Sequence, residues 1–187
     1  MLAIRLFYSA ILSLFFFSSV VWASPLPVPK TVDADVLFSR GRPGPPVPSL
    51  DEMKRHLRVL PDTSLFYSSN QKITTGPRSE QQAQAWARGN HPTYKILKDM
   101  WTDSRYLRPW MKTDKVKDFF DVASKAMAEL SSGTVYVFMG GAWTEADGKD
   151  WYDQSVWARI EWPALQTNHN VHTIYRTNGT ATIRIKG

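Results

Sequence analysis

VKDFFDVASKAMAELSSGTVYVFM, residues 116–139, joins a helix pattern directly to a strand pattern. Its first part places apolar side chains on one helical stripe, and Asp114 and Gly133 are the expected cap and stop of that helix. Residues 134–139 form an almost continuous apolar run, which favours a strand buried on both faces. The stretch therefore predicts a helix followed at once by a strand in the core of a mixed α/β domain. The stripe consists of Val116, Phe119, Phe120, Ala123, Met127 and Leu130.

Shorter patterns on either side complete the expected fold. Helix patterns cover residues 50–60, which Ser49 caps, 79–88 and 93–101, and strand patterns cover residues 36–38, 63–67, 155–162, 171–176 and 180–186. Helices dominate the first two thirds of the chain and strands the last third. We therefore expect an α/β fold with a helical N-terminal part and a small, mostly parallel C-terminal sheet flanked by helices.

The N-terminal residues predict export. Arg5 precedes an apolar stretch at residues 6–21, and Val21 and Ala23 are suited to signal-peptidase cleavage after Ala23. A membrane anchor is the competing interpretation, but serines interrupt the stretch, and no later apolar run is long enough to cross a bilayer. We therefore expect a secreted protein without stable membrane insertion, with a signal peptide at 1–23, a proline-rich arm at 24–48 and a single domain at 49–187.

Composition narrows the classes of function. The 187-residue chain has a net charge of +6, but its basic residues are scattered, so we expect no nucleic-acid partner. It has no cysteine, and a domain of this size can be stabilised by burial alone. Asn178-Gly179-Thr180 is a glycosylation sequon, which fits export.

A metal site is not expected. The acidic loop containing Glu145, Asp147, Asp150 and Asp153 lacks the spacing of an EF-hand. His169 and His172 are three residues apart but have no further histidine or cysteine near them in the sequence, so the pair does not predict a zinc site.

The segment SVWARIEW, residues 155–162, is the first candidate for chemistry. As a strand, it would place Ser155, Trp157, Arg159 and Glu161 on one face, because successive side chains point to opposite sides. A carboxylate beside an indole and a guanidinium makes this face a candidate site. The other interpretation is an Arg159–Glu161 ion pair on a solvated face.

Several segments in order resemble the ADP-ribosyl cyclase/cyclic ADP-ribose hydrolase family. The resemblance covers roughly residues 60–177 and is carried by the aromatic pair and serine of FFDVASKAMAE (119–129), the apolar strand and glycines of GTVYVFMGG (133–141) and SVWARIE (155–161). Upstream, LFYS (65–68) is similar to the family's Leu-aromatic-Trp-Ser segment, and HPTYK (91–95) to its Thr-Leu-Glu segment.

The resemblance implies a glycohydrolase that cleaves the nicotinamide–ribose bond of NAD to give ADP-ribose, with some cyclic ADP-ribose. NAD is then a small-molecule dinucleotide substrate, and no cofactor is expected. Glu161 falls on the catalytic glutamate, Ser124 on the serine near the reacting ribose, and Tyr67 and Phe120 on two tryptophans that flank the nicotinamide. The further substrate-binding candidates are Ser68, Lys95, Ser155, Trp157 and Arg159.

The chain departs from the family at three points. Lys95 stands where the family has a glutamate that tunes cyclisation against hydrolysis, the family's disulfides are absent, and both tryptophan positions hold other aromatic residues. A carboxylate beside the ribose still suits the reaction, because it stabilises the positive charge that develops as nicotinamide leaves. Arg159 would keep Glu161 ionised or bind a phosphate.

Two alternatives remain at this stage. FSRGRP, residues 38–43, resembles the opening strand of bacterial mono-ADP-ribosyltransferase toxins, but those enzymes place Glu or Gln two residues before the catalytic glutamate, where this chain has Arg159. The second alternative is a secreted effector that keeps the fold without catalysis. The sequence does not identify a host target.

Overall fold

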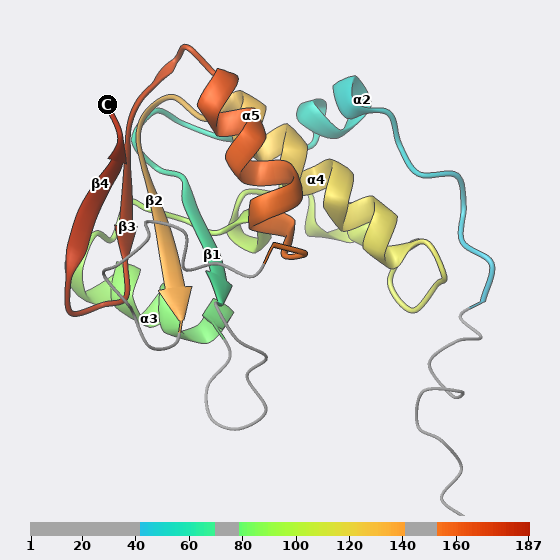
Figure 1. The fold of residues 1–187 in the computed structure, drawn as a ribbon. Helices are drawn as coiled ribbons and strands as arrows, with labels where there is room; N and C mark the ends of the chain where they lie inside the picture. The colour runs from blue at the N-terminus through green and yellow to red at the C-terminus, as the bar shows by residue number, and fades with distance from the viewer. Residues whose placement is uncertain (1–41, 70–78, 141–152) are drawn as a thin grey trace, which may run out of the picture.

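A four-stranded sheet with helices on both faces forms the centre of the molecule (Figure 1). The computed structural model describes residues 42–69, 79–140 and 153–187. The strands run in the order β1 (Leu65–Ser69), β2 (Gly133–Gly140), β3 (Val171–Thr177) and β4 (Thr182–Lys186). β1, β2 and β3 are parallel, and β4 pairs antiparallel with β3. The expected α/β class with a mostly parallel sheet is confirmed.

The helices divide between the two faces of the sheet. α2 (Leu50–Arg55), α4 (Val116–Leu130) and α5 (Trp162–Thr167) belong to the larger core cluster, and α3 (Ser79–Asn90) belongs to the smaller one. Two 3₁₀ turns, Leu97–Asp99 and Ser104–Leu107, and a π-helical segment, Trp157–Glu161, complete the described elements.

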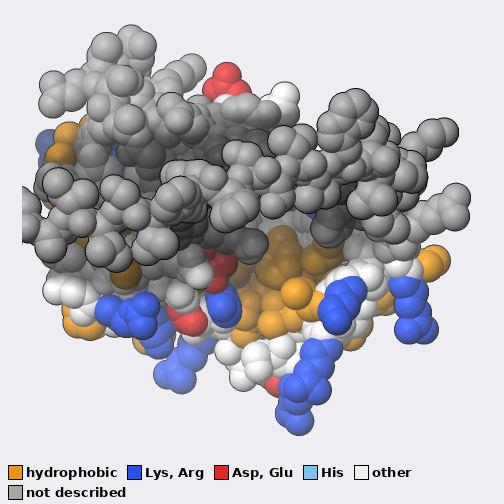
Figure 2. Space-filling model, turned by 90° about the horizontal axis from the view of Figure 1, so that it is seen from below, with side chains coloured by type: hydrophobic (Ala, Val, Ile, Leu, Met, Phe, Trp, Pro, Cys, Tyr) orange, Lys and Arg blue, Asp and Glu red, His pale blue; other side chains and the backbone are white. Residues whose placement is uncertain are grey.

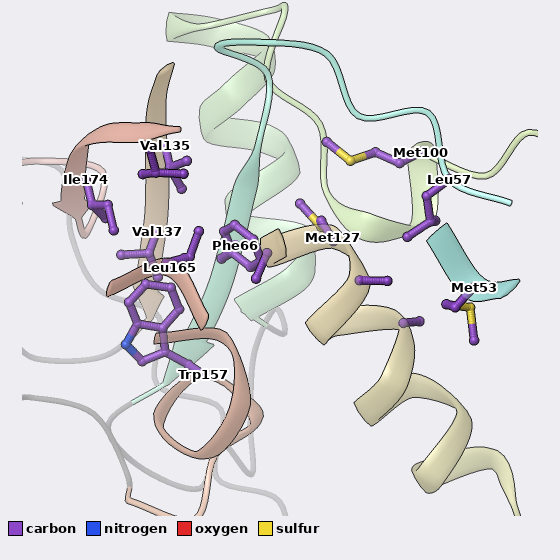
Figure 3. Close-up of a cluster of buried hydrophobic side chains, with 14 of the residues drawn as sticks. Met53, Leu57, Phe66, Met100, Met127, Val135, Val137, Trp157, Leu165 and Ile174 are labelled. Atoms are coloured by element: carbon purple, nitrogen blue, oxygen red, sulfur yellow. The ribbon is translucent and has the colours of Figure 1, made fainter. Parts of the chain in front are cut away.

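β2 is covered on both faces, as its apolar run predicts. Val135 and Val137 are fully buried in the larger cluster, beside Phe66, Trp157 and Ile174 (Figure 3). Phe138 points to the other side and packs with α3. Burial on both faces fixes the strand in the middle of the domain and so positions the end of its neighbour, β1.

α4 buries the stripe that the sequence predicts, with Phe119, Ala123 and Met127 almost fully enclosed. The expected cap was wrong: Lys115 occupies the N-cap position, and the Asp114 carboxylate instead accepts the backbone N–H of Gly44 at 3.0 Å. The helix ends at Leu130, before Gly133. That glycine begins β2 with a φ of 72°, a conformation that side chains other than glycine rarely adopt.

Two expected helix lengths were wrong. α2 stops at Arg55, five residues before the predicted end, because the chain turns at His56 and Leu57 bridges to Trp101. Residues 93–101 form only one 3₁₀ turn. Lys95 is extended there because its N–H and carbonyl bond to Thr63 and Leu65, so pairing with the start of β1 replaces helical hydrogen bonds.

The strand predicted at residues 155–162 is helical. The Ser155 hydroxyl oxygen accepts the N–H of Ala158 at 3.1 Å, as a helix-capping serine does, and the π-helical segment leads directly into α5. Trp157, Glu161 and Leu165 are all buried at a spacing of four residues. Helical geometry therefore accounts for the burial of this segment, whereas alternation would have exposed one whole face.

Several expectations concern residues outside the described part of the chain. They are the signal peptide, most of the proline-rich arm, the strand at 36–38, most of the toxin-like segment at 38–43 and the acidic residues Glu145, Asp147 and Asp150. Within the described ranges, no helix combines the length and the apolar character that a bilayer crossing requires. The same residues contain no group of side chains suited to hold a metal ion.

Candidate active site

A pocket of about 720 Å³ lies at the carboxyl end of β1. Figure 2, which views the molecule from below, shows hydrophobic side chains gathered in a hollow with lysine and arginine side chains around it. Ligand sites of parallel α/β sheets commonly occur at this edge, and the volume suits a small organic ligand. The walls come from β1, the start of α3, the segment 97–111, α4 and the π-helical segment.

Glu161 is the buried acid of this pocket. Its side chain is contributed by the π-helical segment, and the residue is only 8% exposed. Burial, aided by the negative charge of Asp121, raises the pKa of Glu161 to about 8, because a low-polarity environment disfavours the charged carboxylate. Its Oε2 atom has no hydrogen-bond partner among the described residues. The pocket wall thus holds a mostly buried carboxyl group, one oxygen of which has no hydrogen-bond partner among the described residues.

Ser124 is the polar partner of that acid. It lies on α4, is 7% exposed and lines the same pocket. Its hydroxyl donates a hydrogen bond to the Glu161 carboxyl group, which lowers the pKa of Glu161 and partly offsets burial. Two residues far apart in the sequence are therefore brought together, because α4 packs directly against the π-helical segment.

Arg159 does not pair with Glu161. Its Nη2 atom lies 3.5 Å from Oδ2 of Asp121, and its Nε donates to the carbonyl of Gln154. Residues two positions apart in a helical segment lie on nearly opposite sides, and Arg159 does not line the pocket that Glu161 lines. The expectation that Arg159 holds Glu161 ionised was therefore wrong in its geometry.

Aromatic side chains form part of the pocket wall. Tyr67 is 36% exposed, and burial together with the nearby carboxylates of Glu80 and Glu161 raises its pKa to about 12. Phe120 is half-buried and packs edge-on against Phe119. Trp157 is 1% exposed and packs on Phe66 with ring centroids 5.9 Å apart, so it supports the wall from within the core.

Six of the nine predicted site residues line this pocket: Tyr67, Ser68, Phe120, Ser124, Trp157 and Glu161. The other three do not. Ser155 caps the following helical segment, Arg159 pairs with Asp121, and Lys95 lines a separate pocket of about 320 Å³ near α3. Asn178, the sequon residue, starts the turn between β3 and β4, where its Oδ1 accepts the N–H groups of Thr180 and Ala181.

Sequence reasoning missed one wall of the pocket. Glu80 from α3 and Lys98, Trp101 and Arg108 from the segment 97–111 all line it. The last three lie in irregular chain and short 3₁₀ turns, where periodicity gives no signal. Only the fold brings them to the pocket that Glu161 also lines.

No family model matches the chain, and no curated protein matches it in sequence. Several solved structures match part of its backbone, among them the following three. An Aplysia cyclase complexed with substrate NGD and product cGDPR is 15% identical with a TM-score of 0.43, and the match covers 63% of this chain and 49% of that one. Porcine CD38 with a covalent intermediate is 18% identical with a TM-score of 0.42, over 65% and 55% of the two chains.

The third structure is an ADP ribosyl cyclase complexed with N1-cIDPR, 13% identical with a TM-score of 0.41, over 63% of this chain and 49% of that one. This chain therefore spans about half the length of the proteins it matches. The likeness to all three is partial and distant.

Proposed function

We propose that this protein is a secreted NAD glycohydrolase that releases nicotinamide and ADP-ribose. The observation that carries the proposal is the buried carboxyl group of Glu161, which lines a pocket large enough for a nucleotide and has one oxygen without a partner among the described residues. The hydrogen bond from Ser124 orients that group. The resemblance of the segments around both residues to ADP-ribosyl cyclases adds to this support.

The chemistry follows from the properties of the site. The bond between ribose C1′ and the ring nitrogen breaks, and its electron pair leaves with nicotinamide. Positive charge then develops on the ribose, and the ionised form of Glu161 stabilises it inside a region of low polarity where electrostatic interactions are strong. Water adds at C1′, loses a proton to solvent and gives ADP-ribose.

The pyridinium ring of the substrate also favours ionisation of the acid. NAD carries a positive charge on the ring nitrogen, so its binding beside Glu161 lowers the pKa of that group from its value in the empty pocket. The wall formed by Tyr67 and Phe120 offers aromatic faces for the planar ring. Lys95 has no part in this site, because it lines the other pocket.

The test is incubation of the purified protein with NAD, with and without a lysate that supplies acceptor proteins, followed by chromatography of the products. We expect equal amounts of nicotinamide and ADP-ribose, and a loss of at least about 100-fold in rate for Glu161→Gln. Glu129→Gln is the matched control, because Glu129 pairs with Lys54 on the other side of α4 and does not line the pocket. Transfer of ADP-ribose to a protein of the lysate would instead indicate a transferase. Unchanged NAD would indicate a binding protein without catalysis.

Export is a separate part of the proposal, based on residues 1–23. N-terminal sequencing of the protein recovered from culture medium should begin at Ser24. A shift in mass that disappears in Asn178→Gln would show use of the sequon. Retention of the whole chain inside the cells would overturn export and leave the enzymatic proposal intact.

A further inference from the structure

One wall of the pocket is rich in hydrogen-bond donors. Lys98, Trp101 and Arg108 all line it, and all come from the segment that connects α3 to α4. Their side chains offer an ammonium, an indole N–H and a guanidinium, which can donate but cannot accept hydrogen bonds. Glu80 adds one carboxylate to the same wall, beside Lys98, whereas the polar groups around Glu161 are its own carboxyl and the Ser124 hydroxyl.

The indole N–H of Trp101 has no hydrogen-bond acceptor among the described residues. Its Nε1 atom is buried and has no hydrogen-bond partner among the described residues, although the indole stacks on Phe119 at 5.8 Å. A buried N–H without a partner costs free energy, since it has lost its hydrogen bonds to water. An acceptor that reaches this N–H when the wall repacks around a ligand would recover that cost.

The charges on the wall are not fully balanced. Lys98 lies 3.4 Å from Glu80, but 70% of its side chain is exposed, and such exposed pairs contribute little and re-form easily. Arg108 is exposed and forms no ion pair with the described residues. Its neighbour Arg105 contacts Asp103 at 3.1 Å, and the charge of Arg108 acts on the same carboxylate only from a greater distance, as one of the weaker causes that lower the pKa of Asp103. The pocket therefore presents positive charge on this side.

We propose that Lys98, Trp101 and Arg108 form a subsite for an anionic group of the ligand, a phosphate or a carboxylate. Guanidinium and ammonium groups bind both anions through charge-assisted hydrogen bonds. The subsite rests on the proposed function, because it lies in the same pocket as Glu161. In a nicotinamide dinucleotide the anion is the diphosphate, whereas in a nicotinic acid derivative it is the carboxylate of the ring.

Binding without turnover tests the subsite independently of catalysis. Calorimetry would measure the dissociation constants of ADP-ribose, inorganic pyrophosphate and nicotinate for the full-length protein and for Lys98→Gln, Arg108→Gln and Trp101→Phe. We expect Arg108→Gln to weaken at least one of these anions about tenfold. Arg105→Gln is the matched control and should bind as the wild type does, because Arg105 is already held by Asp103 and does not line the pocket.

The pattern of losses identifies the anion. Weaker binding of ADP-ribose and pyrophosphate assigns the wall to a diphosphate, and weaker binding of nicotinate alone assigns it to a ring carboxylate. Equal affinities for Arg108→Gln, Arg105→Gln and the wild type would overturn the subsite, as would the absence of binding of all three probes. If anion binding depends on Arg108 but the protein leaves NAD intact, the subsite is supported and the proposed glycohydrolase activity is refuted.

Discussion

The hydroxyl of Ser124 on α4 donates a hydrogen bond to the carboxyl group of Glu161 on the π-helical segment, and both residues are more than nine-tenths buried. This contact joins two elements that the chain contributes from separate regions. The hydrogen bond from Ser124 lowers the pKa of Glu161, whereas burial raises it.

The pH dependence of NAD hydrolysis should follow the ionisation of Glu161. Because its pKa in the empty pocket is about 8, most of the free protein carries the protonated, inactive form at neutral pH. We expect kcat/KM to rise with pH and to level off above about 8. A profile that is already flat between pH 5 and 8 would contradict the assignment of Glu161 as the required anion.

Removing the Ser124 hydroxyl should move that profile to higher pH. Ser124→Ala loses the hydrogen bond that favours the carboxylate, so the pKa of Glu161 rises further and kcat/KM at pH 7 falls, by about tenfold if the pKa rises by about one. At pH 9 or above the variant should recover much of its activity. Ser132→Ala, which lies after α4 and outside the pocket lining, should leave the profile unchanged.

Removing the charge of Asp121 should move the profile in the opposite direction. Asp121 raises the pKa of Glu161, so Asp121→Asn makes the carboxylate easier to form and increases kcat/KM below pH 7. The measurement is the same pH series. Movement of both variants to the same side would show that packing, rather than charge, explains their effects.

The stability of the fold should depend on pH through the same acid. In the unfolded chain Glu161 has an ordinary pKa of 4.5, whereas the folded protein holds its proton up to about 8. The free energy of unfolding therefore falls as pH rises between these two values, by about 1.4 kcal/mol for each step of one in pH, and levels off above pH 8. Glu161→Gln should flatten this dependence and exceed the wild type in stability at pH 9, as measured by urea denaturation. The exposed Glu52→Gln should retain the wild-type slope.

Trp157 should matter more for folding than for binding. It is 1% exposed and contacts Phe66 and Trp162, so Trp157→Ala leaves a cavity in the core and costs about 3–5 kcal/mol of unfolding free energy. Phe120→Ala, at a half-buried position of the pocket wall, should cost less stability and raise KM for NAD. Equal losses of stability in the two variants would contradict this division.

Sequence patterns predicted the parts of the fold with strong periodicity. α4 and β2 follow from a stripe of six apolar residues and an almost continuous apolar run, which tertiary contacts reinforce. The strand predicted at 155–162 was wrong because the spacing of its apolar residues fits both a strand and a helix. Val156, Ala158 and Ile160 alternate as in a strand, while Trp157 and Glu161 have helical spacing, and the Ser155 hydroxyl caps the start of the helical segment.

The candidate site was only partly predictable for a related reason. Ser124 was identified only through the resemblance, whereas Glu161 was first a candidate through strand alternation, which is not the geometry of this segment, and then through the resemblance. Arg159 was placed beside Glu161 by strand geometry, and a helix turns the two side chains apart. Lys98 and Arg108 lie in irregular chain, so only long-range packing brings them to the pocket.

Glu161 Oε2 has no hydrogen-bond partner among the described residues, and the binding of NAD should therefore change the number of protons that the protein holds. At neutral pH the carboxyl group of Glu161 is mostly protonated when the pocket is empty, and the positively charged ring of NAD favours loss of that proton. Uptake of NAD should then acidify a weakly buffered solution before any product forms, a burst that an indicator dye can follow in a stopped-flow instrument. ADP-ribose, whose ribose carries no cationic ring, should bind without a change in the pH of the solution.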